Sequence, residues 1–90
     1  MDFEWDVNKN QANLSKHGVS FEEARNVFDG SPLVYFDANQ SLDEDRYVAI
    51  GFAGMRLLTV VFVTRGAETT RIISARKAST SEEKRYERGY

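Results

Sequence analysis

The spacing of apolar side chains changes about a third of the way along the chain. From Phe21 to Phe28, apolar residues recur at the three- or four-residue spacing that is typical of an amphipathic helix. From Leu33 onward they alternate with polar residues or run together, which is typical of strands. The predicted order is a strand, two helices, four strands and a final helix.

Local signals place the boundaries of the first strand and the first helix. A short strand is expected from Asp2 to Trp5. Asp6 is a favourable N-cap for a helix from Val7 to His17, because its carboxylate can accept bonds from the first turn. Gly18 stands where a glycine commonly ends a helix.

A second helix is predicted to begin after Ser20. Residues 20–23 read Ser-Phe-Glu-Glu, the pattern of a capping box. The apolar residues that follow at helical spacing are Phe21, Ala24, Val27 and Phe28. The Gly-Ser-Pro sequence at 30–32 ends this helix, since proline cannot continue it.

The rest of the chain predicts a sheet. Strands are expected over 33–36, 46–52, 57–64 and 68–77. They are separated by a polar, acidic loop over 38–45 and by turns over 53–56 and 65–67. The strand 57–64 is apolar on both faces, so we expect it at the centre of the sheet.

The last helix differs from the others because it has almost no apolar face. Ser79 or Thr80 caps it, with a glutamate three residues later. Its only large side chains on one face are Tyr86 and Tyr90. A helix this polar gains little by docking on its own domain. We therefore expect it to be loosely docked, frayed or completed by a partner.

These elements predict a single α+β domain over residues 1–90, with two N-terminal helices packed on a mostly antiparallel sheet. The absence of cysteine excludes disulfides, thiolate catalysis and thiolate metal sites, and one histidine cannot supply a multi-histidine zinc site. Neither a metal nor a cofactor is expected. No apolar run could span a membrane, and the acidic start is unlike a signal peptide, so the expected compartment is the cytoplasm.

Charge divides the chain into two halves. Residues 1–45 carry three basic and ten acidic side chains, a net −7, and residues 46–90 carry nine basic and four acidic, a net +5. Such asymmetry is a hint of a polyanionic partner. The alternative is that the two halves neutralise each other in the fold.

The cations that end the last strand are the first candidates for chemistry. Arg76 and Lys77 stand where the strand runs out, and a guanidinium is a fixed fork of donors suited to phosphate. In a regular strand these two point to opposite faces, and Arg71 shares the face of Lys77. The alternative is a strand end with ordinary surface cations.

A family resemblance joins these features. The segments that carry it are Phe3-Glu4-Trp5-Asp6, Lys16 to Ala24, Val27-Phe28, Arg46 ahead of Ile50-Gly51, Arg71 to Ala78, and Glu82 with Tyr86. In this order they resemble a BrnT-type toxin. The resemblance implies a RelE-like fold, endoribonuclease activity that inhibits translation, and a BrnA-type ribbon-helix-helix antitoxin as partner. Operator DNA would be bound only through that antitoxin.

Metal-free RNA cleavage needs a base, an acid and cations that stabilise the phosphorane. His17 is the residue that titrates near neutral pH, and the helix dipole favours its cationic form. It suits an acid or a phosphate-binding cation, or else it merely caps carbonyls before Gly18. Lys16 can likewise meet a phosphate or only interact with the dipole.

Glu82 and Tyr86 are four residues apart and share one helix face. Glu82 can serve as a base, or as the acid of a capping box. Tyr86 can orient a phosphate or stack on a base, or it can anchor a helix that has little else to bury.

The predicted function is that of a toxin endoribonuclease. The expected catalytic residues are His17, Arg76 and Glu82, and the expected RNA-binding residues are Lys16, Arg71, Lys77 and Tyr86. A non-catalytic module that binds an antitoxin and supports operator binding is the alternative, because a fold does not determine a function. We also expect the antitoxin to bind near the last helix, since tyrosine is enriched at interface anchors.

Overall fold

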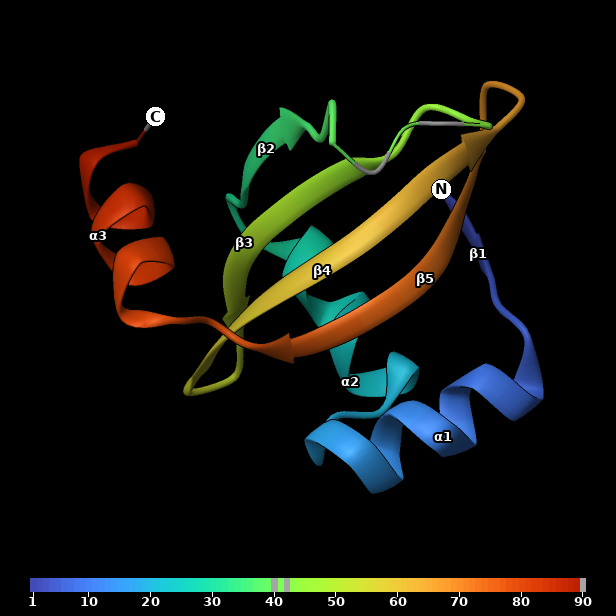
Figure 1. Cartoon of the computed structure of the whole chain (residues 1–90), viewed down its shortest axis with the longest axis horizontal. Helices are drawn as coiled ribbons and strands as arrows, with labels where there is room; N and C mark the ends of the chain where they lie inside the picture. Colours follow the sequence, from blue (N-terminus) through green and yellow to red (C-terminus); the bar gives the residue numbers. More distant parts are fainter. Residues whose placement is uncertain (40, 42, 90) are drawn as a thin grey trace.

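The computed structural model describes residues 1–39, 41 and 43–89 (Figure 1). Its elements are β1 (Asp2–Glu4), α1 (Val7–His17), α2 (Phe21–Arg25), the 3-10 turn η1 (Asn26–Asp29), β2 (Leu33–Phe36), β3 (Tyr47–Ala53), β4 (Arg56–Arg65), β5 (Thr69–Lys77) and α3 (Thr80–Arg88). Apart from η1, which completes the second helix as a tighter turn, this is the predicted order. The α+β class is confirmed.

The five strands form one sheet in the order β1-β5-β4-β3-β2. Only β1 and β5 are parallel, and β4 is central, as its apolar sequence predicted. The register between β4 and β5 shifts once, because Val61 faces Ser74 while Phe62 faces Ile72. Ile73 is therefore an extra residue, a β-bulge that reverses the alternation of side chains along β5.

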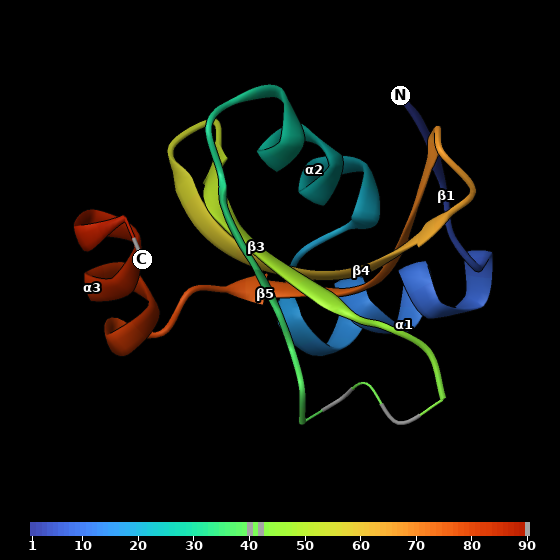
Figure 2. The ribbon, with the colours of Figure 1, turned by 90° about the horizontal axis from the view of Figure 1, so that it is seen from above.

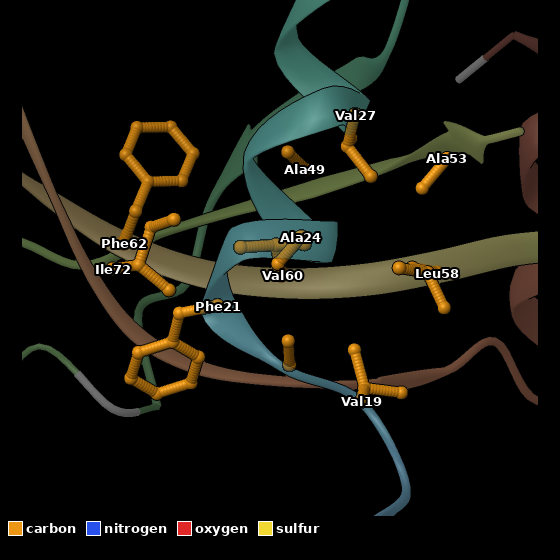
Figure 3. Packing of buried hydrophobic residues seen from close by; sticks show 11 residues of the cluster. Val19, Phe21, Ala24, Val27, Ala49, Ala53, Leu58, Val60, Phe62 and Ile72 are labelled. Carbon is orange, nitrogen blue, oxygen red and sulfur yellow. The ribbon is translucent and has the colours of Figure 1, made fainter. Parts of the chain in front are cut away.

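One face of the sheet, here called the α2 face, is covered by α2 and η1 (Figure 3). Phe21, Ala24 and Val27 from this layer are fully buried. They pack with strand residues that include Val60 and Leu58. The helical spacing of apolar residues therefore identified the layer that forms the core.

Helix α1 lies along the outer edge of β5 and buries only Asn13 (Figure 1). The Asn13 amide donates to the carbonyl oxygen of Ala75 over 2.7 Å and accepts from the Ala75 N–H over 3.2 Å. The side chain thus replaces a neighbouring strand where β1 has ended. A buried asparagine is stable here because both halves of its amide are bonded.

Gly18 ends α1 with φ 69°, a left-handed conformation that favours glycine. The hairpin between β3 and β4 is shorter than predicted, because Ala53 pairs with Arg56 and only Gly54 and Met55 form the turn. Arg56 is therefore a strand residue. Its Nε donates to Glu23 of α2 over 2.8 Å.

Helix α3 stands apart from α1 and α2 at one end of the sheet (Figures 1 and 2). Ser79 and Glu82 form the predicted capping box, and no residue of α3 is buried. Tyr86 packs edge-on against Phe52 with ring centroids 5.6 Å apart. Tyr90, which was predicted to join Tyr86, lies outside the described residues. No helix among the described residues is long and apolar enough to cross a membrane.

Candidate functional site

Arg76 lies near the end of β5 on the face of the sheet opposite α2, here called the α3 face. It pairs in register with Thr59 of β4, whose hydroxyl points to the same side and is bonded to α3. Its guanidinium forms two parallel bonds with the Glu82 carboxylate, 2.6 Å from Nη1 to Oε1 and 2.9 Å from Nη2 to Oε2. The end of β5 and the start of α3 are therefore joined by a bidentate ion pair.

Glu82 is held by three elements at once. Besides the two bonds from Arg76, it accepts from the Ser79 N–H over 2.8 Å and from the Thr59 hydroxyl over 3.0 Å. Its side chain is 15% exposed. Burial alone would raise the pKa of Glu82, but the bonds from Arg76, Ser79 and Thr59 outweigh it and lower the pKa to about 2.

A carboxylate in this state is a poor proton acceptor. It is already ionised at neutral pH, and its oxygens receive four hydrogen bonds. Glu82 instead orients the guanidinium of Arg76 through the two bonds between them. The same ion pair raises the pKa of Arg76, so that its charge is permanent.

The Arg76 guanidinium keeps an edge that faces away from Glu82. A guanidinium has five N–H donors in a fixed fork. Glu82 takes one each from Nη1 and Nη2, and the Lys77 carbonyl takes another from Nη1 at 3.3 Å. Nε–H and the second Nη2–H have no partner among the described residues. This edge has the geometry that binds two oxygens of a phosphate.

Tyr35 and Arg85 complete a group that we call the Arg76 cluster: Arg76, Glu82, Thr59, Tyr35 and Arg85. The Arg85 guanidinium lies 3.6 Å from the centroid of the Tyr35 ring, a cation–π contact between α3 and β2. Burial raises the pKa of Tyr35, against the opposing charges of Arg85 and Arg76. The phenol therefore keeps its proton at neutral pH.

Neither Tyr35 nor Arg85 was predicted from the sequence to be a site residue. The alternation of β2 places Tyr35 on the face opposite Val34, and Arg85 is three residues beyond Glu82 on α3. These spacings predict the face on which each side chain lies. They do not predict that β2 and α3, which are far apart in sequence, lie against each other.

Arg71 lies on the α3 face with Arg76, so the prediction that it shares the face of Lys77 is wrong. The bulge at Ile73 is the physical reason, because Arg71 pairs with Val63 and Arg76 with Thr59, residues on one side of β4. Arg71 also has a structural partner, since its Nη1 donates to Glu4 of β1 over 2.7 Å. It joins β1 to β5 beside the strand pairing.

Lys77 and Tyr86 lie at the margin of the cluster. Lys77 pairs with Leu58 and so points to the α2 face, away from Arg76. Tyr86 is half-buried against Phe52, so it anchors α3 to the sheet, which is one of the two roles predicted for it. A groove of about 440 Å³ between α3 and the start of β2 is lined by Tyr86 and Leu33.

Lys16 and His17 end α1 and are exposed. They line a shallow groove of about 230 Å³ between α1 and β5, together with Lys9, Ile73 and Ser74. Ser74 is on the α3 face, two residues before Arg76, which corresponds to about 7 Å along a strand. The groove therefore leads toward the Arg76 cluster. Within residues 1–39, 41 and 43–89, no three His, Cys, Asp or Glu side chains converge on a possible metal position.

Comparison with solved structures identifies the class of protein that has this fold. The 1.1 Å crystal structure of the ribonuclease toxin BrnT of Brucella abortus matches with a TM-score of 0.70 and 31% sequence identity. The match covers 89% of this chain and 99% of the Brucella chain. The fold is therefore that of a ribonuclease toxin.

The sequence family agrees with the fold. Residues 5–82 match the family described as the ribonuclease toxin BrnT of type II toxin–antitoxin systems. This chain belongs to the BrnT family. No curated protein matches it in sequence.

Proposed function

We propose that this chain is a cytoplasmic endoribonuclease that cleaves RNA without a bound metal ion and thereby inhibits translation. The observation that carries the proposal is the Arg76–Glu82 pair, which fixes a permanently charged guanidinium with one donor edge directed away from its partner. The family is one of ribonuclease toxins. A preorganised cation at the position of developing negative charge is the largest contribution that such a site can make.

Cleavage proceeds by attack of the 2′-oxygen on phosphorus and release of the 5′-oxygen, which leaves a cyclic phosphate and a 5′-hydroxyl. Arg76 binds two oxygens of the scissile phosphate, and Arg85 adds a second positive charge from α3. Glu82 positions Arg76 rather than accepting a proton, since its pKa is about 2.

Two groups remain to move the two protons. Tyr35 keeps its proton because its pKa is raised, so it suits donation to the departing 5′-oxygen. We assign removal of the 2′-hydroxyl proton to His17, in place of the acid role expected from the sequence, because His17 lines the groove that leads toward the Arg76 cluster. Lys16 assists by binding a neighbouring phosphate along the groove that His17 lines. Arg71 contacts the RNA backbone farther along the α3 face, Lys77 contacts it from the α2 face at the end of β5, and Tyr86 supports α3.

A matched pair of arginine variants tests the site. Arg76→Ala removes the phosphate donor, and loss of one such donor costs about 2–4 kcal/mol in the transition state, a loss of about 30- to 900-fold in rate. Arg65→Ala is the control, because Arg65 is also a strand arginine paired with a glutamate, Glu44, but it lies beside Thr69 at the start of β5, far from Arg76. Purified protein is incubated with single-stranded RNA in excess chelator, and fragments are quantified.

Four results contradict parts of this proposal. Equal loss in both variants makes Arg76 structural. Activity that disappears with EDTA and returns with magnesium makes the enzyme metal-dependent. Growth arrest that persists in Arg76→Ala favours the alternative, a module that acts by binding a protein. For His17, an unchanged pH–rate profile in His17→Gln removes it from proton transfer.

The toxin–antitoxin family also implies a protein partner. We propose that it is a BrnA-like ribbon-helix-helix antitoxin, and that operator DNA is contacted through the antitoxin alone. Co-purification followed by an operator-binding assay, with and without the toxin, tests both statements. Operator binding by the isolated toxin would contradict the second.

A further inference from the structure

Strand β2 forms one of the two edges of the sheet, and its outer side has no partner strand among the described residues (Figure 1). The Asp37 N–H donates to the Arg46 carbonyl over 2.9 Å, and this pair continues the antiparallel register of β2 with β3. In an antiparallel ladder, every second residue directs its N–H and C=O groups to the neighbouring strand, and the residues between them direct theirs away from it. Tyr35 therefore turns its backbone groups toward β3, whereas Val34 and Phe36 turn theirs outward.

The same two residues carry exposed apolar side chains. Val34 is 48% exposed and Phe36 is 49% exposed. Both project on the α2 face, where their register partners are Ala49 and Tyr47. Natural edge strands are usually protected by charge, bulges or a covering element, since an open apolar edge pairs with other chains. This edge combines unpaired backbone groups with apolar side chains.

An apolar groove continues this surface across the α2 face. Its volume is about 340 Å³, and Val34 forms part of its wall. Phe28 and Phe62 also line it, together with the exposed Met1. The β2 edge and the groove together, here called the β2 surface, accept a backbone along the edge and apolar side chains beside it.

Charge next to the β2 surface specifies its partner further. Residues 37–46 follow β2 directly and carry four acidic side chains and one basic, a net −3. Glu68 lines the groove on its other side. Arg65 already pairs with Glu44 at 3.7 Å. A partner that places lysine or arginine beside its apolar residues is therefore complementary.

We propose that the β2 surface receives an extended segment of the antitoxin, which adds a strand to β2 and is flanked by basic residues. The proposal rests on the assignment of a protein antitoxin to this toxin. Backbone bonds to Val34 and Phe36 give affinity, and alternate apolar side chains in the groove give specificity. Tyr35 lies between those two residues and faces the Arg76 cluster, so the added strand runs beside the site.

Two phenylalanines of equal exposure provide the test. Phe36 and Phe52 are both 49% exposed, but Phe36 belongs to the β2 surface and Phe52 contacts Tyr86 of α3. The toxin is co-expressed with the antitoxin of its own pair, and the affinity of the purified complex is measured. We expect Phe36→Lys to weaken binding about 30-fold or more, the size of an interface hot spot. Phe52→Lys should change it less than about threefold, as for a residue outside the interface.

A second pair of variants keeps the test valid if Phe36→Lys does not fold. Val34→Lys should weaken the complex as Phe36→Lys does. Asp43→Lys combined with Asp45→Lys leaves the core untouched and should slow association and reduce its salt dependence, as loss of a steering charge does. Circular dichroism of each variant verifies folding.

The opposite pattern overturns the proposal: binding kept in Phe36→Lys and lost in Phe52→Lys places the antitoxin on α3. Self-association of the toxin through β2 that persists in the complex also overturns it, because a second copy then fills the edge. Growth arrest reports on the ribonuclease separately. A chain that binds the antitoxin through β2 but never arrests growth contradicts only the proposed activity.

Discussion

Helices α2 and α3 begin with the same pattern, Ser-x-x-Glu, and each places its glutamate against an arginine from a strand. Glu23 pairs with Arg56, and Glu82 pairs with Arg76. The helices are nevertheless held differently. α2 buries Phe21 and Ala24 completely, whereas no residue of α3 is buried.

The two glutamates differ in the same way. Glu23 leaves its capping box half-formed, because its carboxylate is directed to Arg56. Glu82 closes the box at Ser79 and also bonds Thr59 and Arg76. The Glu23–Arg56 pair lies on a helix that is already held in place by the burial of its apolar residues. The pair in α3 is one of the contacts that join its helix to the sheet, beside Tyr86 on Phe52 and Arg85 on Tyr35. The position of α3 and the orientation of Arg76 therefore depend on each other.

Truncating one aromatic residue in each helix should give the largest contrast. Phe21→Ala opens a cavity in the core and should lower the free energy of unfolding by about 3–5 kcal/mol. Tyr86→Ala should lower it by less than about 1 kcal/mol, because its partner Phe52 is itself half exposed. Urea denaturation measures both. Equal losses would mean that α3 belongs to the cooperative core.

Neutralising each glutamate compares the two ion pairs. Glu82→Gln should lower RNA cleavage about 10- to 100-fold, since bonds to charged groups contribute about 1.5–3 kcal/mol. It should also speed amide exchange over residues 80–88. Glu23→Gln should leave cleavage and α3 exchange unchanged, because the buried core holds α2. Cleavage that falls equally in both would contradict a special role for the α3 pair.

Acid should release α3, because protonation of Glu82 removes its pairing with Arg76. The pKa of Glu82 is lowered from 4.5 to about 2, so its contribution is complete above pH 4.5 and is lost as the pH falls through about 2. The resonances of Tyr86 should therefore shift within this window. Glu82→Gln should abolish the shift, and its persistence in that variant would assign it to another group.

Removing each cap should have the smallest effect. Ser20→Ala and Ser79→Ala each delete a side-chain acceptor for the third residue of a helix, worth about 1 kcal/mol. In α2 the loss should appear in global stability with cleavage unchanged. In α3 the loss should appear as faster amide exchange within that helix and a modest fall in RNA cleavage. Identical profiles for the two variants would remove the distinction between the helices.

The sequence by itself determined the order of the elements and most of their boundaries. Asp6 and Gly18 bracket α1, and the change of apolar period separates helices from strands. These signals are local, because caps and periodicity act within a few residues of one another. Arg76 and Glu82 were identified for the same reason, since a strand end and a capping box are both local features.

Only the tertiary structure decided which residues meet. The bulge at Ile73 moved Arg71 to the face of Arg76, and a bulge depends on the pairing of two strands. Tyr35 and Arg85 meet because β2 and α3, about fifty residues apart in the chain, lie side by side. The strand order likewise left Val34 and Phe36 at an open edge. Such contacts depend on the packing of distant segments, on which the spacing of residues within any one segment gives no information.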